Sequence, residues 1–338
     1  MNNFADRLVA IVRKRRSLVV AGLDPRLNLL PGGIVRAAFR RHGRTPKGAA
    51  RAILDFNRVC LDVIAPHVAA VKPQVAFYEQ WGPEGLAAFE ATCRAAKDRG
   101  LLVIADVKRG DVPGTAVAYA AGLMLSEVEG IRRGDPPIDA VTVNPYFGTD
   151  AMHPFVLAAK ETGKGLFVLV RTSNPSASEI QDLPVPSSKF QVPSSKSAPQ
   201  QSAIRRSAQP DQPLFLKVAK LCREWGGGVI GRCGYSSVGA VVGATAPAQA
   251  RAVRRALPKA FFLVPGYGAQ GGTAEDIRAC LNPDGLGAVV NASRSLTFPW
   301  AGKGEAGVGW ENQIEKAVLA MKEDLRDVSS KFQVPRSK

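Results

Sequence analysis

The chain has 338 residues, 46% of them hydrophobic, and a formal net charge of +16 at pH 7. This length permits one large α/β barrel or two ordinary domains, and the apolar content predicts a soluble globular protein with a sizeable core. The basic runs at 13–16 and 254–255 carry no interleaved aromatic residues, which argues against a nucleic-acid platform and favours an anionic small ligand or a solvated basic surface.

The N-terminal segment 1–16 is expected to form a short amphipathic helix that ends in a basic turn. Asp6 interrupts its apolar residues, so the segment does not read as a signal peptide. No stretch approaches the length of a membrane-spanning helix. Five scattered cysteines without a C-x-x-C pair and three distant histidines argue against a disulfide framework and a zinc site. We therefore expect a cytoplasmic protein that needs no metal.

Short apolar or β-branched runs recur along the chain, and each is followed by a helical pattern. The eight runs are 18–24, 68–73, 101–108, 138–145, 165–173, 238–245, 260–266 and 286–293. Strands that are apolar on both faces and separated by helices indicate a parallel sheet with both faces covered. Eight such units predict a closed (β/α)₈ TIM barrel as a single domain over residues 1–328, with a doubly wound open sheet as the structural alternative.

One segment, 184–213, differs in composition from the rest of the predicted barrel. It holds six prolines, seven serines and five glutamines in 30 residues, so it is predicted to be a disordered surface insertion. Inside it, the decapeptide at 187–196 recurs at 329–338, in the predicted flexible C-terminal tail, with nine of ten positions identical. Its composition favours a low-complexity duplication over a short recognition motif.

Polar residues gather where the apolar runs end. They are Asp24, Lys72, Asp106, Lys108, Asn144, Ser173 and Arg294. A single such residue more often just begins a loop. In a barrel, however, the carboxyl ends of all strands meet at one mouth, where catalytic groups of this architecture lie. The whole set therefore predicts an active site at that mouth.

The stretch "LLVIADVKRGDVPGTA" (101–116) brings several charges to the end of one strand. Side chains alternate along a strand, so Asp106 and Lys108 are expected to face the same way, with Asp111 following across a glycine turn. A lysine held between two carboxylates stays protonated. Lys108 is then a proton donor or an electrostatic anchor rather than a Schiff-base nucleophile. A buried structural ion-pair network is the alternative.

The glycine-rich stretch "VPGYGAQGGTAEDI" (264–277) opens a helix, with Thr273 as its expected N-cap. Residues 266–271 formally match the dinucleotide fingerprint G-x-G-x-x-G, but the acid that would bind the ribose is missing downstream. Together with Arg294 after the next strand, the loop predicts a site for one phosphate group. Ser173 could read a polar ring edge or form a local turn before Pro175.

Seven motifs in this order resemble the orotidine 5′-monophosphate decarboxylase family, in its longer bacterial branch (type 2). They are "GLDP" (22–25), "VKP" (71–73), "DVKRGDVPGTA" (106–116), "VNPYFG" (143–148), "TSNP" (172–175), "PGYGAQGG" (265–272) and "SRS" (293–295). The resemblance implies a (β/α)₈ barrel, usually a homodimer with shared active sites. It also implies conversion of orotidine 5′-monophosphate to UMP and CO₂, without a cofactor, in de novo pyrimidine biosynthesis.

The resemblance also implies roles for individual residues. Lys108 matches the lysine that protonates C6 as CO₂ departs, and Lys72 and Asp106 match its charged neighbours. Asp111 and Thr115 match residues that reach into the partner's site across the dimer.

The remaining matches concern the substrate. Asp24 corresponds to a ligand of the ribose hydroxyls, Ser173 to the residue that reads the pyrimidine amide, and Gln270 and Arg294 to the phosphate grip. One departure is Ser293, which stands before Arg294 where the shorter family branch has glycine.

Two other functions stay open at this point. A metal-dependent sugar-phosphate decarboxylase or aldolase-like enzyme could use the same barrel, and extra acids near the mouth would support it. From a different class, the net charge of +16 permits an RNA-binding or scaffold role for the basic tail and its decapeptide.

Overall fold

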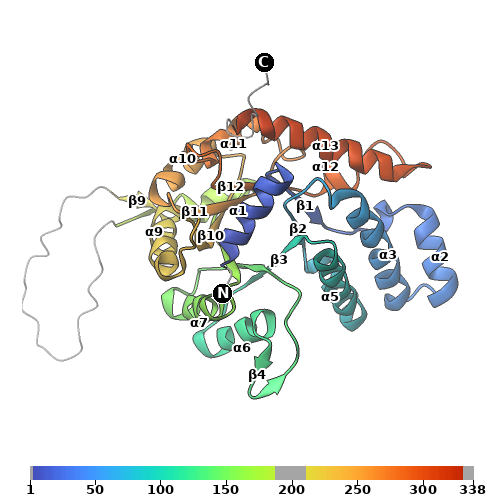
Figure 1. Cartoon of the computed structure of the whole chain (residues 1–338), viewed down its shortest axis with the longest axis horizontal. Helices are drawn as coiled ribbons and strands as arrows, with labels where there is room; N and C mark the ends of the chain where they lie inside the picture. Colours follow the sequence, from blue (N-terminus) through green and yellow to red (C-terminus); the bar gives the residue numbers. More distant parts are fainter. Residues whose placement is uncertain (1–2, 187–210, 330–338) are drawn as a thin grey trace, which may run out of the picture.

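Eight parallel strands form a closed barrel in the computed structural model, which describes residues 3–186 and 211–329 (Figure 1). In chain order the strands are β1 (Val19–Leu23), β2 (Ala70–Pro73), β3 (Leu102–Arg109), β6 (Ala140–Val143), β7 (Gly165–Arg171), β10 (Ser236–Val242), β11 (Ala260–Val264) and β12 (Ala288–Ala292). β1 pairs with both β2 and β12, and this pairing closes the sheet. Each strand overlaps one of the predicted runs. The TIM barrel is confirmed, and the closure rules out the open sheet.

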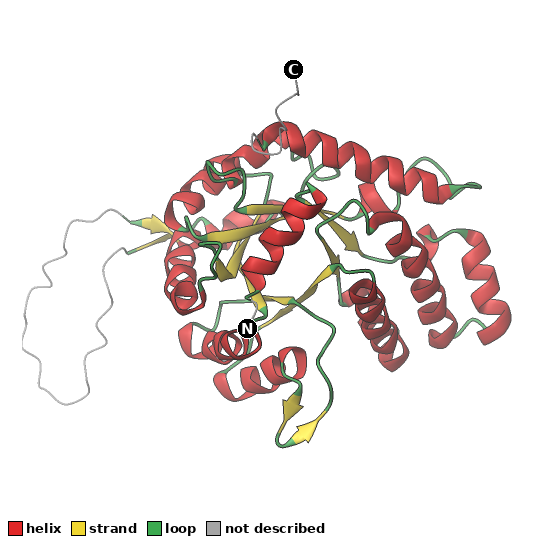
Figure 2. Ribbon diagram, in the orientation of Figure 1, coloured by secondary structure: helices red, strands yellow, loops and turns green. Residues whose placement is uncertain are grey.

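Helices cover the outside of the barrel (Figure 2). Those that follow successive strands are α3 (Pro46–Ile64), α5 (Gly82–Asp98), α6 (Pro113–Met124), α7 (Thr149–Thr162), α9 (Leu214–Gly226), α10 (Pro247–Ala256), α11 (Ala274–Ile277) and α13 (Trp310–Val328). Further helices are α1 (Phe4–Arg15), α2 (Gly32–His42), α4 (Ala76–Glu79), α8 (Ser178–Gln181) and α12 (Arg294–Thr297). The start of α11 confirms Thr273 as N-cap, because its side chain accepts a hydrogen bond from the amide of Asp276.

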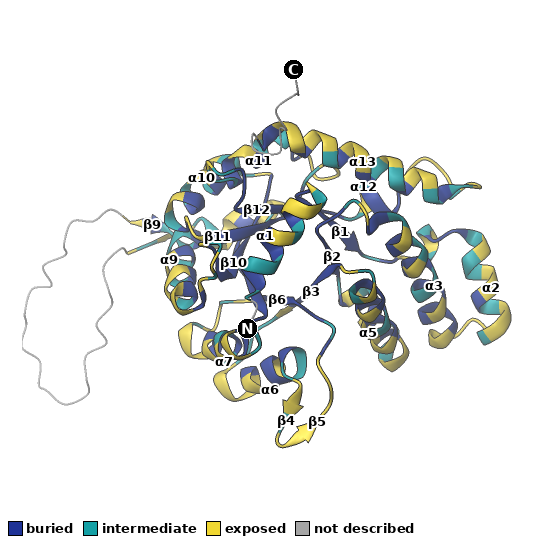
Figure 3. Ribbon diagram, in the orientation of Figure 1, coloured by how far each residue is buried: buried dark blue, intermediate teal, exposed yellow. Residues whose placement is uncertain are grey.

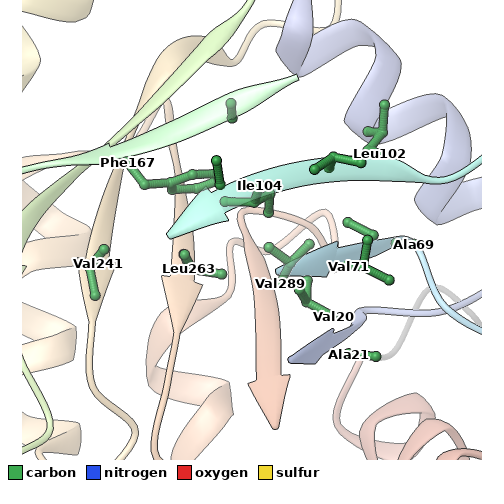
Figure 4. Packing of buried hydrophobic residues seen from close by; sticks show 14 of the residues in the cluster. Val20, Ala21, Ala69, Val71, Leu102, Ile104, Phe167, Val241, Leu263 and Val289 are labelled. Atoms are coloured by element: carbon green, nitrogen blue, oxygen red, sulfur yellow. The ribbon is translucent and has the colours of Figure 1, made fainter. Parts of the chain in front are cut away.

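The core lies in the barrel interior and between the strands and the helices. Figure 4 shows the interior, where side chains such as Val20, Ile104, Phe167 and Leu263 come together. Buried residues dominate the strands, and exposed residues lie on the outer surfaces of the helices (Figure 3). Burying apolar surface on both faces of every strand supplies the main driving force for this architecture.

Helix α1 closes the amino-terminal end of the barrel. Phe4 packs edge-on against Phe167 with ring centroids 5.9 Å apart. A Cβ atom at Gly165 would lie 2.2 Å from the Phe4 ring, so glycine at the start of β7 allows this packing. The helix ends in Arg13, Lys14 and Arg15, as the sequence predicted. The opposite end, where the strands terminate, is the mouth of the barrel.

Short strands tie together the two ends of the predicted insertion 184–213. β8 (Pro184–Val185) pairs antiparallel with β9 (Gln212–Pro213), and the amide of Leu214 donates to the carbonyl of Leu183 at 2.8 Å. The prediction of disorder is therefore wrong for these flanking residues. Residues 187–210, with the first copy of the decapeptide, lie outside the described ranges, as does the second copy beyond Ser329.

Two further observations complete the fold. A small hairpin, β4 (Glu127–Val128) with β5 (Ile131–Arg132), projects between α6 and β6 and was not predicted. Across residues 3–186 and 211–329, no helix is both long enough and apolar enough to cross a membrane.

Candidate active site

A cavity of about 260 Å³ opens at the carboxyl ends of the barrel strands. Five residues predicted for the site line it together: Asp24, Lys72, Asp106, Gln270 and Arg294. They come from the ends of β1, β2, β3, β11 and β12, which lie far apart in the chain. The convergence follows from the barrel geometry, because parallel strands deliver their terminal residues to the same mouth.

Asp106 is the centre of the hydrogen-bond network in this cavity. Lys72 Nζ donates to its Oδ2 and Lys108 Nζ to its Oδ1, each at 2.6 Å. Gln74 Nε2 donates to Oδ2 and Thr142 Oγ1 to Oδ1, each at 2.9 Å. Both carboxylate oxygens thus accept one charged and one neutral hydrogen bond. The carboxylate lies between two lysines.

These contacts fix the charge states of the buried pair. Asp106 and Lys72 are only 6% and 5% exposed. Burial alone would raise the pKa of Asp106, but the charges of Lys72 and Lys108 outweigh it and hold that pKa well below its usual range. Burial alone would lower the pKa of Lys72, but the charges of Asp106 and Asp24 outweigh it and raise that pKa. At neutral pH Asp106 is therefore ionised and Lys72 is protonated.

Lys108 reaches Asp106 by a different backbone path from the one predicted. Its φ angle is +44°, in the left-handed region, so the strand does not alternate regularly at this point. Its side chain is 45% exposed, in contrast to the buried Lys72. The ammonium group therefore bonds the buried carboxylate while part of the side chain stays accessible.

Asp111 and Thr115 lie away from the cavity of their own chain. The Asp111 carboxylate accepts a hydrogen bond from the amide of Val112 at 2.8 Å. Within the described ranges, Lys108 forms an ion pair with Asp106 and none with Asp111. Within a single chain, Lys108 therefore lies beside one carboxylate, Asp106, and not between two. Thr115 is exposed near the start of α6 and does not line the cavity either.

The glycine-rich loop after β11 folds back on itself at the rim of the cavity. The amides of Gly268, Gly271 and Gly272 donate to carbonyls within the loop, at 2.8 to 3.0 Å. These three amides are thus not free to bind an anion, contrary to the simplest interpretation of the glycine pattern. Gln270 lines the cavity, and the Tyr267 hydroxyl bonds the Asp324 carboxylate on α13. The loop is anchored to the C-terminal helix.

Arg294 is the first residue of α12 and lines the cavity beside Ser293. A Cβ atom at Gly22 would lie 1.9 Å from Ser293 Oγ, so the serine side chain occupies space that glycine at 22 leaves open. Ser293 is accommodated by the neighbouring strand β1, and it does not displace Arg294 from the cavity.

Ser173 lies next to Gln270 but does not line the cavity. The Cβ atom of Ser173 and the Oε1 atom of Gln270 lie 3.1 and 3.2 Å from the position that a Cβ atom of Gly266 would take. Both side chains therefore lie close to Gly266. The local turn is present as well, since a short 3₁₀ helix begins at Pro175.

Sequence reasoning missed several residues of the site. Gln74 and Thr142 bond Asp106, and Arg26 and Asn291 line the cavity. The buried Oδ1 atoms of Asn291 and Asp24 have no hydrogen-bond partner among residues 3–186 and 211–329, so both are available to a ligand. Gln74 directly follows the "VKP" motif, which was a usable signal. Thr142 gave none, because threonine is an ordinary residue in a strand.

Over the parts of the chain that the structure describes, no three or more His, Cys, Asp or Glu side chains gather in a way that could hold a metal ion. The two acids of the cavity are Asp24 and Asp106. Both oxygens of Asp106 are already bonded to lysines.

Comparison with known proteins agrees with this geometry. Residues 53–298 match the model of the orotidine 5′-phosphate decarboxylase / HUMPS family. A protein named orotidine 5′-phosphate decarboxylase from Caldicellulosiruptor bescii is 36% identical over 301 residues, or 89% of this chain and 91% of the relative. One of the same name from Rhodopirellula baltica is 36% identical over 332 residues, covering 96% and 100%.

A solved structure gives the same result. The OMP decarboxylase of Leishmania donovani superimposes with a TM-score of 0.68 at 27% sequence identity, covering 97% of this chain and 99% of that one. The sequence resemblance is therefore confirmed along nearly the whole chain. The chain belongs to the orotidine 5′-phosphate decarboxylase / HUMPS family of enzymes.

Proposed function

We propose that the chain decarboxylates orotidine 5′-monophosphate to UMP and CO₂, with no cofactor and with Lys108 delivering the proton to C6. The observation that carries this proposal is the array Lys72–Asp106–Lys108 beside the cavity, with ion pairs of 2.6 Å on each side of the carboxylate. The names of the curated relatives support the choice of substrate.

The chemistry explains why fixed charges would be useful here. Loss of CO₂ from C6 leaves an electron pair on a carbon whose ring does not delocalise it well. An enzyme can stabilise such a carbanion with positive groups that are already held in place. Lys72 and Lys108 are two such groups, and Asp106 keeps both oriented. Lys108 would then complete the reaction by transferring one ammonium proton to C6.

The remaining contacts of the cavity suit a nucleotide. Arg294 and Gln270 would bind the phosphate, with the guanidinium offering two parallel donors. Asp24, whose buried Oδ1 has no partner in the described part of the chain, would accept a hydrogen bond from a ribose hydroxyl. Binding energy from these remote groups would hold the ring against the lysines.

The direct test measures UMP formed from orotidine 5′-monophosphate by the purified chain. We expect turnover, and we expect it to persist after exhaustive chelation. Activity lost on chelation and restored by a divalent cation would contradict the cofactor-free reaction and favour the metal-dependent sugar-phosphate enzyme. No turnover of this substrate at all would overturn the proposed function.

Arg294→Ala should lower kcat/KM for orotidine 5′-monophosphate by about 10- to 100-fold, the range for loss of a charge-assisted hydrogen bond. The effect should nearly vanish with orotidine, which lacks the phosphate that Arg294 would bind. Steady-state kinetics on both substrates measures this. Arg26→Ala is the matched control, because Arg26 lines the same cavity and has no assigned phosphate contact. An equal penalty on both substrates would remove Arg294 from the phosphate site.

We further propose that the composition-biased segment is no part of the catalytic unit. Replacing residues 187–210 by a six-residue glycine-serine linker keeps the β8–β9 pair, which already holds the two ends together. Loop-closure entropy changes slowly with length, so we expect kcat/KM within about threefold of the parent. A folded but inactive variant would place the segment in the site.

We propose a homodimer in which Asp111 and Thr115 act in the partner's site. Their position outside the cavity of their own chain supports this arrangement.

A further inference from the structure

The hydroxyl of Thr142 in β6 uses its full hydrogen-bonding capacity within the site. Its Oγ1 accepts from the amides of Val107 and Lys108, at 3.0 and 2.9 Å. It donates to Asp106 Oδ1 at 2.9 Å. A threonine hydroxyl has two acceptor lone pairs and one proton. Because the two amides occupy the lone pairs, the proton has Asp106 as its acceptor.

These bonds coincide with an irregularity between β3 and β6. Ala105 is paired with Val141, and the next pairing joins Arg109 to Val143. Asp106, Val107 and Lys108 thus lie opposite the single residue Thr142. In a bulge of this kind, the extra amides lose their partners on the neighbouring strand. Here the side chain of Thr142 replaces those partners for Val107 and Lys108.

The bulge also contains the left-handed backbone conformation of Lys108, with φ at +44°. A residue other than glycine keeps such a backbone conformation only where its surroundings hold it in place. The hydrogen bond from the Lys108 amide to Thr142 is a contact that does so. Thr142 is only 1% exposed, and its hydroxyl links the Lys108 backbone to the Asp106 carboxylate.

We propose that Thr142 is a positioning residue, which sets the geometry of the Asp106–Lys108 pair through the bulge in β3. It does not line the cavity, so it would act through these two residues and not on the substrate. This inference rests on the proposed function where it concerns catalysis. Its structural part, the fixing of the bulge, stands apart from the identity of the substrate.

Thr142→Val is the sharpest variant, because valine keeps the shape of threonine and removes the hydroxyl. We expect kcat to fall about 10- to 100-fold with KM within about threefold, since the change leaves the amides of Val107 and Lys108 without this partner and misplaces Lys108. Thr142→Ser restores the hydroxyl and should stay within about threefold of the parent in both constants. Thr92→Val is the control: Thr92 is equally buried and accepts a bond from Asn57, away from the site.

Hydrogen exchange gives a readout that does not depend on activity. The amides of Val107 and Lys108 should exchange at least about tenfold faster in Thr142→Val than in the parent and in Thr142→Ser. If Thr142→Val does not fold, Thr142→Cys takes its place, because a thiol is a weak donor and acceptor. Its kcat should then fall well below that of Thr142→Ser at the same KM.

The outcomes separate the two proposals. A parent protein that does not turn over orotidine 5′-monophosphate, with the expected exchange pattern, overturns the proposed function and supports the role of Thr142 in the bulge. Unchanged exchange in a folded Thr142→Val protein overturns the inference. The inference is also overturned if the parent is active and Thr142→Val keeps the kcat of the parent, raises only KM, or behaves like Thr142→Ser.

Discussion

Replacing Lys108 with alanine is expected to lower kcat by about 10³-fold or more. In the proposed reaction, the change removes both the proton donor for C6 and a fixed positive charge beside the developing carbanion. General acid catalysis alone contributes about 10² to 10⁴, and a preorganised electrostatic contact about 10² to 10³. Substrate affinity should change far less, because the charge of Lys108 would stabilise the developing carbanion more than the ground-state substrate. Steady-state and single-turnover kinetics of UMP formation measure both effects.

A second substitution separates the two roles of Lys108. Lys108→Arg keeps the positive charge, but a guanidinium does not release its proton at neutral pH. If Lys108 is the proton donor, the arginine variant should be nearly as slow as the alanine variant. Substantial activity with arginine would instead show that the charge alone is needed. Lys160→Ala, at an exposed lysine near the end of α7, is the control for loss of a surface charge and should retain full activity.

The second large effect concerns the shared sites of the proposed dimer. Lys108→Ala and Asp111→Ala proteins should each be nearly inactive, and a mixture under conditions of subunit exchange should regain activity. In a mixed dimer, one site has both residues intact and the other lacks both. Random pairing of equal pools makes about half of the dimers mixed, so recovery should approach about a quarter of the parent activity. Kinetics of the mixture, with exchange verified by subunit labelling, tests this.

The structure supplies a matched control for this mixing experiment. Lys72 and Lys108 both bond the same Asp106, so they serve one site of one chain. A mixture of Lys72→Ala and Lys108→Ala proteins therefore has no intact site in any dimer and should stay inactive. If the Asp111→Ala mixture also stays inactive despite exchange, Asp111 serves its own chain and the shared-site arrangement fails.

The barrel and the place of its site could be predicted from the sequence, for a physical reason. Each strand is buried on both faces, so it appears as an uninterrupted apolar run such as 101–105, and eight runs with intervening helices leave few architectures. Residues at strand ends then converge without further information. This is why Asp24, Lys72 and Arg294 could be grouped before any coordinates, although about 270 residues separate the first from the last.

The contacts within the site were harder to predict, because they depend on departures from regular structure. Asp106 and Lys108 lie together as the sequence predicts, but a bulge rather than regular strand alternation produces the contact. The hydroxyl that holds the bulge lies 34 residues further along the chain, in a stretch that reads as an ordinary strand. Likewise, Asp111 follows Lys108 closely in the sequence, but the glycine turn between them does not fix the direction of the Asp111 carboxylate.

The left-handed backbone at Lys108 has a consequence for how this strand can change. An L-residue in that conformation costs about 1 to 2 kcal/mol, a cost that glycine avoids. Asp106 would keep its ion pair with Lys72 if Lys108 were lost. Glycine at position 108 would relieve the backbone strain but lose the ion pair with Asp106, and, if Lys108 is the proton donor, the proposed reaction as well. At position 108, the backbone conformation and the proposed catalytic role would then favour different amino acids.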